Sequence, residues 1–506
     1  MKSPVPPSGA RRRDLLVGGG LLALSARMSA DAQTRTRSRS ARSPGKAPNI
    51  VFMLVDNMGW GDLSCYVGPI RGQNTPRIDK LAAEGLRLTN FNVEPECTPS
   101  RSAFMTGRMP IRSGTSRVVI SEGRDGLATW EYTLSELLSD AGYATACFGK
   151  WHLGSSQGRL PTMQGFDEWF GIPRSSGETA WALQPDFDPA VYQEQPVMEG
   201  RKGEPSRTLR DYDYAYRPFI DREVTDRSVD FIRRKSKEQK PFFLYTPFTL
   251  PHVPPLAHPD FVKPGRTQYQ NVLAEIDYNV GRILDELSAA GIDEDTIVVF
   301  ASDNGPQSFQ GVGIDYGGQS DTGPFRNEFA SAWEGAVRTP CIVRWTGRTS
   351  AGRVSNEIVS LLDFYRTFAG LAGASERIPS DRAVDSVDQS AFLFGDAEKS
   401  AREHCMFFYR DELLAVKWRS YKIHFKVREP AEGLVRAPGQ NVSVGVVTEP
   451  NYPWVFHLES DPKELWHVGF TSGWFRGRSV DQIQRDYEDS VRKFPNLKAG
   501  ADGPPA

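Results

Sequence analysis

Short runs of hydrophobic residues alternate along the chain with segments in which hydrophobic residues recur at helical spacing. The continuous, β-rich runs are typical of strands covered on both faces of a sheet, and they span residues 49–55, 144–148, 242–246, 296–300 and 341–345. Helical spacing between them predicts helices over residues 75–84, 133–141 and 268–289. The alternation predicts an α/β fold: a large mixed, mostly parallel sheet flanked by helices.

Beyond about residue 395 the pattern changes to shorter alternating segments. Residues 413–418, 421–426 and 454–458 have the character of strands, and residues 480–494 form a final helical stretch. The economical interpretation is a smaller antiparallel sheet with one helix. We therefore expect a large α/β domain over residues 48–395 and a C-terminal subdomain over residues 396–506.

The N-terminal segment differs from the rest of the chain. Arg11, Arg12 and Arg13 precede a weakly apolar run, and Ala30-Asp31-Ala32 follows it with the small-x-small pattern of a signal peptidase site. Residues 1–32 resemble a twin-arginine signal peptide, which implies passage through the twin-arginine translocase into the periplasm. A disordered basic tail is the alternative interpretation.

Residues 33–47 are rich in Arg and Ser and poor in apolar residues, which indicates a disordered basic linker. A basic arm for anionic surfaces is possible for the same segment, although such runs are usually only solvated. No later run reaches the ~18 apolar residues of a membrane span, so we expect no span in the mature form.

The overall charge does not indicate a particular class of binding partner. The formal net charge of -2 and 25% charged residues are those of an ordinary globular protein and argue against a nucleic-acid partner. The five cysteines are widely spaced and form no CxxC pair, so neither a zinc knot nor a disulfide scaffold is indicated. Cys97 stands out because it lies in a polar, proline-containing segment.

Polar residues follow the predicted strands at the edge where such sheets bind ligands. Asp56-Asn57 and Asp303-Asn304 would offer four oxygen ligands if their strands are neighbours, which suits Ca²⁺ or Mg²⁺. Either pair alone is more often a turn or a helix cap. Lys150 and His152 follow the second run, and His252 follows the third.

The segment around Cys97 predicts the start of a helix. Thr98 is placed to cap the helix, Pro99 to occupy its first position and Gly107 to end it. The group at position 97 would then lie at the positive end of the helix, where an anionic oxygen is stabilised.

A family resemblance emerges at these residues. The run Cys97-Thr98-Pro99-Ser100-Arg101 with Thr106-Gly107-Arg108 resembles the signature of the formylglycine-dependent sulfatases, of arylsulfatase type, in the alkaline-phosphatase-like superfamily. Further motifs follow in that family's order: Asp56, Gly149-Lys150-Trp151-His152-Leu153-Gly154, His252, Ser302-Asp303-Asn304-Gly305 and, near the end, 456–462. The resemblance covers residues 48–464.

The resemblance implies a role for each matching residue. Cys97 would be converted to formylglycine (3-oxoalanine) by a maturation enzyme, and residue 97 would ligate a divalent metal together with Asp56, Asn57, Asp303 and Asn304. Arg101 and Lys150 would hold its hydrate, while Lys150 and His252 would contact the sulfate ester. His252 is our candidate acid for the leaving oxygen, and His152 is the base that lets the second hydroxyl expel sulfate.

Two positions depart from the family pattern. Asn57 stands where the family usually has a second aspartate, which should weaken metal binding or shift its selectivity. Phe329 stands where the family commonly has a lysine before Trp333-Glu334-Gly335. Arg326 is our candidate for a replacement substrate-binding cation; a non-catalytic descendant is the pessimistic interpretation.

The resemblance implies a sulfuric ester hydrolase acting on an aryl or carbohydrate sulfate. A phosphate or phosphonate monoester hydrolase and a non-catalytic protein that binds sulfated ligands remain the alternatives. Ca²⁺ is favoured over Mg²⁺ by the all-oxygen ligands and the resemblance. Trp181, Phe187 and Tyr192 lie in a segment that either walls the alcohol portion of the substrate or simply packs.

Overall fold

A large sheet forms the centre of the molecule in a computed structural model that describes residues 47–68, 74–119, 126–238, 240–307, 310–311, 314–315, 320–429, 446–468 and 470–503. Its strands, in spatial order, are β12 (Arg353–Ser355), β2 (Leu86–Asn92), β11 (Arg338–Trp345), β8 (Thr296–Ser302), β1 (Asn49–Val55), β7 (Phe242–Pro247), β3 (Ala144–Lys150), β4 (Glu168–Ile172), β5 (Pro196–Arg201) and β6 (Arg207–Asp211), with β13 (Val359–Ser360) also paired to β2. The pairings of β1 with β7 and β8, and of β3 with β4 and β7, are parallel; β11, β5 and β6 pair antiparallel.

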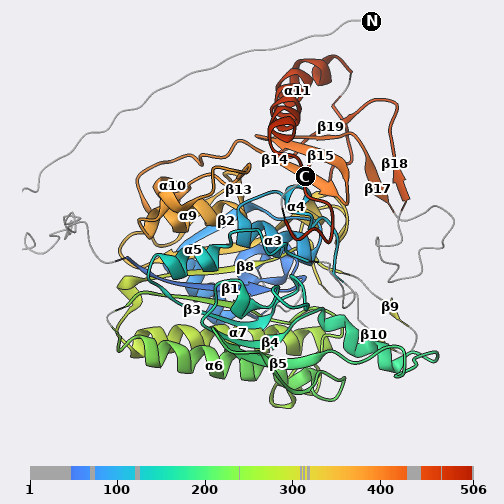
Figure 1. The fold of residues 1–506 in the computed structure, drawn as a ribbon. Helices are drawn as coiled ribbons and strands as arrows, with labels where there is room; N and C mark the ends of the chain where they lie inside the picture. The colour runs from blue at the N-terminus through green and yellow to red at the C-terminus, as the bar shows by residue number, and fades with distance from the viewer. Residues whose placement is uncertain are drawn as a thin grey trace, which may run out of the picture. The chain divides into compact units, whose positions relative to one another are not determined.

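Helices cover both faces of this sheet (Figure 1). One face carries α2 (Pro76–Glu84), α6 (Ile220–Lys235) and α7 (Gln268–Ala289), and the other carries α3 (Cys97–Thr106), α5 (Leu134–Asp140), α9 (Asp363–Leu371) and α10 (Ser390–Phe394). Short helices complete the chain: α1 (Ser64–Val67), α4 (Pro110–Ser113), α8 (Glu334–Val337) and the 3-10 turns Trp60–Asp62, Pro161–Met163, Ser176–Leu183, Arg217–Phe219, Pro259–Phe261, Asp293–Asp295 and Ser375–Arg377.

The central strand β1 shows why this run forms a strand. Ile50, Phe52 and Leu54 pack on one face of the sheet, while Val51 and Met53 pack on the other. All five side chains are fully buried. Burying each side chain contributes roughly 1.5–3 kcal/mol, so a continuous apolar run is stable only where both faces are covered.

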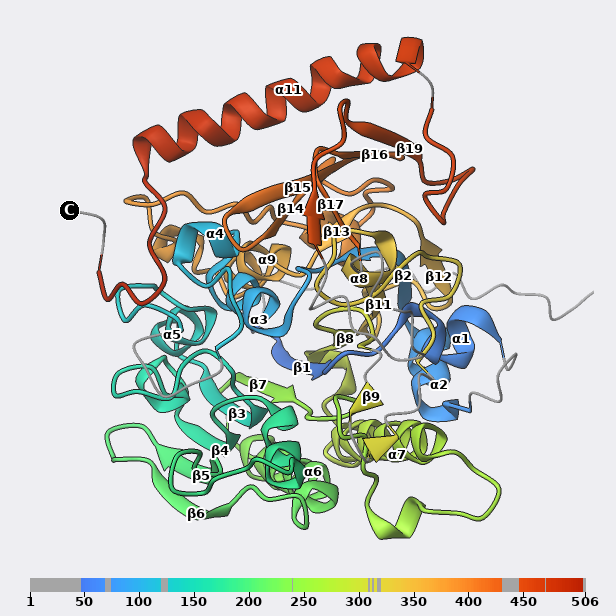
Figure 2. The same ribbon diagram turned by 90° about the vertical axis from the view of Figure 1, so that its right-hand side faces the viewer.

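The C-terminal part builds a separate, smaller sheet, as predicted. It consists of β14 (His404–Tyr409), β15 (Glu412–Trp418), β16 (Tyr421–His424) and β19 (Trp454–His457), all antiparallel. Helix α11 (Phe470–Lys493) lies across it (Figure 2). Two further strand pairs are β17 (Val427–Glu429) with β18 (Val446–Thr448) and β9 (Gln310–Gly311) with β10 (Ile314–Asp315).

Buried ion pairs join the two sheets. Lys417 and Lys422 each place their Nζ atom 2.8 Å from the carboxylate of Glu334, and all three residues are fully buried. Burial alone would raise the pKa of Glu334, but the two lysines and Arg338 outweigh it and hold the pKa well below its usual value. This network fixes the start of β11 to the smaller sheet.

The predicted fold class is confirmed, with corrections to single elements. The five predicted strands form as β1, β3, β7, β8 and β11. The strands β2 and β4 to β6 were not predicted, because their polar and glycine residues interrupt the apolar runs. Helix α11 begins at Phe470, ten residues before its predicted start.

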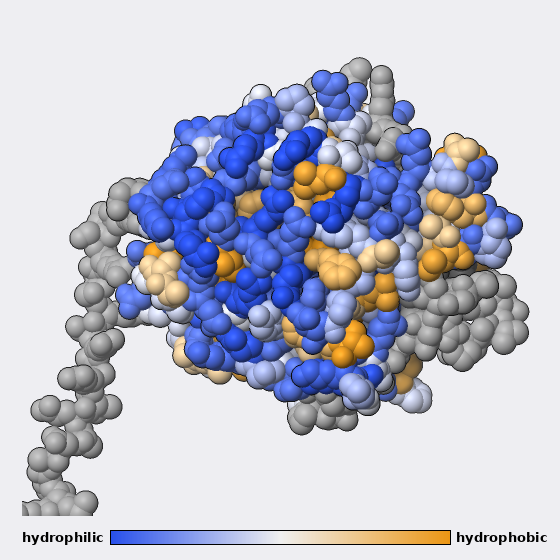
Figure 3. Space-filling model, turned by 90° about the horizontal axis from the view of Figure 1, so that it is seen from below, coloured by the Kyte–Doolittle hydropathy of each residue, from blue (hydrophilic) through white to orange (hydrophobic). Residues whose placement is uncertain are grey.

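The surface beneath α6 and α7 is mostly hydrophilic, with scattered small apolar patches (Figure 3). Among the described residues, no helix combines the length and the apolar character needed to cross a membrane. The predicted signal peptide, and the linker up to residue 46, lie outside the described residues, and the domain boundary at residue 395 stays a prediction.

Candidate active site

Cys97 begins helix α3 beyond the carboxyl edge of the large sheet. The N-cap residue is Glu96, whose side chain makes no capping hydrogen bond, and Gly107 ends the helix in the left-handed region at φ 65°. The predicted capping role of Thr98 is wrong: its hydroxyl donates to the carbonyl of His152 at 3.0 Å. The helix therefore starts two residues earlier than a Thr98 cap requires, and residue 97 lies within its first turn.

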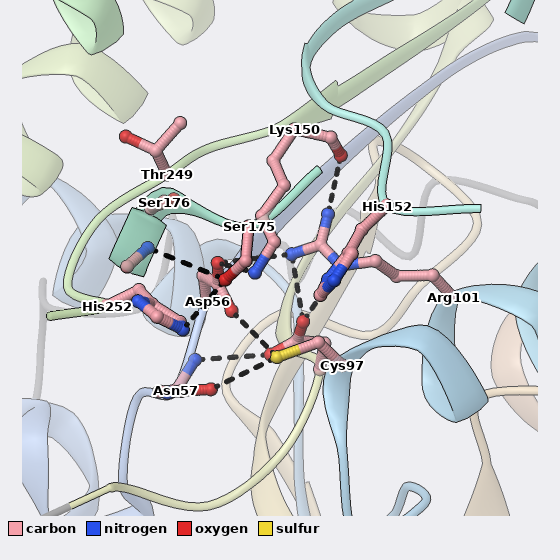
Figure 4. Close-up of polar contacts among 12 residues, drawn as sticks. Asp56, Asn57, Cys97, Arg101, Lys150, His152, Ser175, Ser176, Thr249 and His252 are labelled. Carbon is pink, nitrogen blue, oxygen red and sulfur yellow. Dashed lines mark hydrogen bonds and ion pairs between the residues drawn. The ribbon is translucent and has the colours of Figure 1, made fainter. Parts of the chain in front are cut away.

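Asp56 and Asn57, which follow β1, lie beside Cys97 (Figure 4), and the residues that follow β8 are hydrogen-bonded to Asn57. The two strands are parallel neighbours in which Val55 pairs with Ser302, so the residues that follow them lie side by side. The Cys97 Sγ atom lies 3.4 Å from Asp56 Oδ1 and 3.6 Å from Asn57 Oδ1. The backbone N–H of Asn57 donates to Asp303 Oδ1 at 3.1 Å.

Two buried cations complete this cluster. Lys150 Nζ lies 2.6 Å from Asp56 Oδ2, and Arg101 contacts Asp303 Oδ2 through Nε at 3.0 Å and Nη2 at 2.8 Å. A further bond, from Arg101 Nη1 to the carbonyl of Lys150 at 2.6 Å, fixes the guanidinium to the end of β3. All four side chains are fully buried. The cluster is a buried network of ion pairs and hydrogen bonds.

Burial and charge shift the acids in opposite directions. Burial would raise the pKa of Asp56, but Lys150, His252 and Arg101 together lower it below its usual range. Burial and the neighbouring charge of Asp56 raise the pKa of Asp303 to about 6. Because neighbouring carboxylates repel each other, the two acids favour the binding of a cation beside them.

The donor set fits a divalent metal. The Nδ2 atom of Asn304 donates to Asn57 Oδ1 at 2.5 Å, which leaves Asn304 Oδ1 buried without a hydrogen-bond partner among the described residues. Ligand atoms of Asp56, Cys97 and His252 lie within 4.8 Å of one another. Carboxylate and amide oxygens are hard ligands, so Ca²⁺ or Mg²⁺ suits them better than a thiolate-seeking metal.

His152 presents an unprotonated nitrogen. Its Nε2 lies 2.9 Å from the carbonyl oxygen of Val119, so this nitrogen carries the hydrogen. Its Nδ1 is buried and has no hydrogen-bond partner among the described residues. Burial, reinforced by Lys150 and Arg101, lowers the pKa of His152 well below 6.5. The ring is a neutral imidazole with a free lone pair, as a general base requires.

His252 lies on the other side of Asp56. Its Nδ1 donates to the carbonyl oxygen of Val253 at 2.6 Å, and its Nε2 lies 3.4 Å from the hydroxyl of Ser175. Burial lowers the pKa of His252 to about 4, against the attraction of Asp56. A bound anionic ester would add a second negative charge and favour the protonated ring.

Sequence reasoning missed the residues that hold His252 in place. Ser175 follows β4, and a Cβ atom on Gly177 would lie 3.1 Å from the His252 ring, so this turn packs directly on the imidazole. Arg217 donates to the His252 carbonyl at 3.0 Å, and Asp221 accepts from the backbone N–H groups of Thr249 and Leu250 at 2.9 Å each. Polar residues follow the unpredicted strand β4, and this pattern could have indicated that Ser175 lies at the site.

Phe329 and Arg326, our candidate for the replacement cation, have different surroundings. Phe329 packs in one cluster with Cys97, Ala330 and Tyr409, so it does lie beside residue 97. Arg326 is engaged in structural contacts: it bonds the Glu464 carbonyl at 3.0 Å and the Glu429 carboxylate at 2.7 Å. Its guanidinium also lies 3.9 Å from the centre of the Trp333 ring. A substrate-binding role for Arg326 stays a prediction, and these contacts favour a structural role.

Comparison with known proteins gives consistent matches. A family model described as "Sulfatase" matches residues 48–374, and one described as "C-terminal region of aryl-sulfatase" matches residues 400–496. N-acetylgalactosamine-6-sulfatase of Canis lupus familiaris is 36% identical over 460 residues, which cover 87% of this chain and 84% of that protein. Arylsulfatase A of Homo sapiens is 33% identical over 469 residues, with 90% and 89% covered.

A solved structure shares the whole fold. The crystal structure of the PsFucS1 sulfatase from Pseudoalteromonas sp. superimposes with a TM-score of 0.83 at 33% identity, covering 90% of this chain and 92% of that chain. The match includes both the large sheet and the smaller C-terminal part.

Proposed function

The chain belongs to the sulfatase family, and from that premise we propose that it hydrolyses a sulfate monoester through a formylglycine hydrate derived from Cys97, with a divalent metal. It is an arylsulfatase-like hydrolase, and its relatives support hydrolysis of sulfate esters. The formylglycine, the metal and its identity as Ca²⁺ are our proposals.

One observation carries the proposal: Cys97 is flanked by two buried cations, two acids and a histidine with a free lone pair. Burial raises the pKa of the Cys97 thiol well above its usual value, although Lys150 opposes this shift. An unmodified thiol here is therefore protonated and a poor nucleophile. The charged and polar groups around residue 97 would do little for a protonated thiol. They suit a modified side chain that carries oxygen atoms.

Formylglycine hydrate supplies one hydroxyl as nucleophile and a second that expels sulfate without waiting for water. Asp56, Asn57, Asp303 and Asn304 would hold the metal, whose charge would help to neutralise the sulfate oxygens.

The protein's own side chains supply proton transfer and charge. Lys150, at the end of β3, and Arg101, one turn along α3 from residue 97, stabilise negative charge on the sulfate and on the oxygens of residue 97. The free Nδ1 of His152 accepts the proton of the second hydroxyl. His252, protonated when the anionic ester is bound, donates its Nε2 proton to the leaving oxygen. With Phe329 in place of a lysine, Lys150 and His252 provide the main contacts to the ester.

Parallel assays test the proposal. Protein produced in its own host should release inorganic sulfate from 4-nitrophenyl sulfate and release far less phosphate from 4-nitrophenyl phosphate. A Cys97→Ala variant that folds normally should release neither. Preference for the phosphate would favour the phosphatase alternative, and retention of a sulfated ligand without release would favour a binding protein.

Export remains a proposal from the sequence. We infer that the twin-arginine motif directs the folded protein to the periplasm, with cleavage after Ala32. Cell fractionation with N-terminal sequencing of the mature protein tests this; a cytoplasmic protein that starts at Met1 would contradict it.

A further inference from the structure

The segment that follows helix α11 packs on residues of the large α/β part. Residues 494–502, here called the strap, leave the end of α11 and run past α4 (Figure 2). The backbone N–H of Leu497 donates to the carbonyl of Arg112 at 3.0 Å, and the Leu497 side chain is buried. A Cβ atom on Gly114 would lie only 2.7 Å from the Lys498 carbonyl oxygen. The strap is therefore anchored on α4 and the turn that follows it.

Beyond this anchor the strap reaches a buried cation. Asp502 Oδ1 lies 2.5 Å from Nη2 of Arg159, and the hydroxyl of Thr129 donates to the Asp502 carbonyl at 3.2 Å. Arg159 is 1% exposed, and among the described residues Asp502 is the one carboxylate that forms an ion pair with it. A buried guanidinium needs an anionic partner to offset the loss of its hydration. Asp502 supplies that charge from 343 positions further along the chain.

The rest of Arg159 holds the two neighbours of His152 in the chain. Its Nη1 donates to the Leu127 carbonyl at 2.5 Å, and the Leu127 backbone N–H donates to the Leu153 carbonyl at 2.9 Å. The indole N–H of Trp151 donates to the Arg159 carbonyl at 2.8 Å. The residues before and after His152 are therefore both tied to Arg159, one directly and one through Leu127.

His152 needs this support because its backbone is strained. It lies in the left-handed region at φ 57°, a conformation that persists in such a residue only where the surrounding contacts fix it. In the proposed cycle its Nδ1 accepts the proton of the remaining hydroxyl of residue 97. The oxygen of that hydroxyl forms the aldehyde carbonyl, and the C–O bond to the sulfate breaks. A displacement of about 1 Å is enough to slow such a proton transfer.

Resting on the proposed function for the role of His152, we propose that Asp502 is a positioning residue for the release of sulfate. Its carboxylate keeps the Arg159 guanidinium turned toward the Leu127 carbonyl, and Arg159 in turn keeps residues 151–153 in their observed conformation. Without Asp502 the guanidinium would recover its hydration by turning toward water, and the bonds that frame His152 would weaken. The C-terminal part of the chain thus acts on the reaction through the strap.

Hydrogen exchange tests this connection without any turnover. Amide exchange of the full-length protein, followed by mass spectrometry, would compare wild type with Asp502→Ala. Exchange in peptides that cover residues 126–129 and 150–154 should become roughly 10-fold faster, as for loss of one charge-assisted bond. Peptides of β1 and β8 should not change. Because the Asp502 side chain is 55% exposed, its replacement should leave the protein folded.

Turnover then tests the effect on His152. In Asp502→Ala, steady-state sulfate release should fall roughly 10-fold, as for a small displacement of a catalytic group. The fraction of protein that carries sulfate covalently on residue 97, measured by mass after an acid quench, should rise. A protein that is merely less stable would lose activity without accumulating this ester. Asp502→Glu keeps the carboxylate and should restore both values toward those of the wild type.

Asp489→Ala is a matched control. Asp489 lies in α11 and pairs with Arg492, but both of these side chains are exposed. This variant should change neither the exchange of residues 150–154 nor the turnover. Unchanged exchange in Asp502→Ala, or a loss of turnover without accumulated ester, overturns the inference. Absence of sulfate release by the wild-type protein, with the exchange result as expected, would instead count against the proposed function.

Discussion

Arg217 is expected to affect catalysis without touching the substrate. It is 1% exposed and donates to the Thr249 hydroxyl at 2.7 Å, the Thr249 carbonyl at 3.2 Å and the His252 carbonyl at 3.0 Å. These bonds hold the loop that carries His252. Arg217→Lys keeps the charge but cannot make three bonds in this geometry.

The expected loss of activity in Arg217→Lys follows from the role of the loop that carries His252. General acid catalysis contributes typically about 10²–10⁴-fold, and a displacement of about 1 Å can cost about 100-fold. We expect kcat for phenyl sulfate, whose leaving group needs protonation, to fall roughly 10- to 100-fold. We expect a loss of only a few-fold for 4-nitrophenyl sulfate, whose leaving group needs little protonation.

The assay compares both esters in four proteins: wild type, Arg217→Lys, His252→Asn and the double variant. In the His252→Asn background the Arg217 substitution should have little further effect on phenyl sulfate, because the two act as one unit. Arg222→Lys, in the helix α6 that directly follows the turn of Arg217 and paired with the exposed Asp260, is the control. Equal losses for the two esters in folded Arg217→Lys, or additive losses in the double variant, would refute the reasoning.

Three further predictions concern other parts of the molecule. His152→Ala should reduce steady-state turnover by about 10²–10⁴-fold while leaving the first release of alcohol in a rapid-mixing burst, because only the later proton transfer needs its Nδ1; loss of the burst would contradict this role. Glu334→Gln should cost roughly 3–5 kcal/mol in urea unfolding at pH 7, as for breaking a buried ion pair, whereas Glu403→Gln at a surface pair should have little effect. Since the folded-state pKa of Glu334 is depressed, its ion pairs contribute to the free energy of unfolding above about pH 4.5, and this contribution is lost as the pH falls below that value. The free energies of unfolding of the wild type and Glu334→Gln should therefore become equal in acid. A difference that stays constant with pH would count against the ion pair. Removal of the metal by a chelator should lower both the activity and the melting temperature, and added Ca²⁺ should restore them. Asn57→Asp should tighten Ca²⁺ binding measured by calorimetry. An unchanged melting temperature after chelation would contradict the metal site.

Much of the site was predictable because parallel strands end at one edge. Asp56 and Asp303 follow strands whose apolar runs are unmistakable, and those strands are neighbours. Lys150 ends a third strand of the same kind, and His152 follows it. A mostly parallel sheet places these strand ends at one edge, but the sequence left open whether the strands are neighbours, and the structure supplies that order.

The contacts that could not be predicted depend on distant segments. Ser175 follows an interrupted strand, and Tyr409 approaches Cys97 from a different sheet, more than three hundred residues later in the chain. Arg326 is bound by Glu429 and by the backbone of Glu464, which no local pattern near Arg326 indicates. Threonine is a common N-cap residue, but the hydroxyl of Thr98 donates to the carbonyl of His152, which follows β3. Tertiary contacts decide all four positions.

The chemical state of residue 97 is the central claim. Mass spectrometry of the tryptic peptide Leu88 to Arg101, from protein produced in its own host, measures it directly. The account predicts a mass that corresponds to an aldehyde in place of the thiol at position 97. A fully intact cysteine in protein that releases sulfate from its substrate would contradict it.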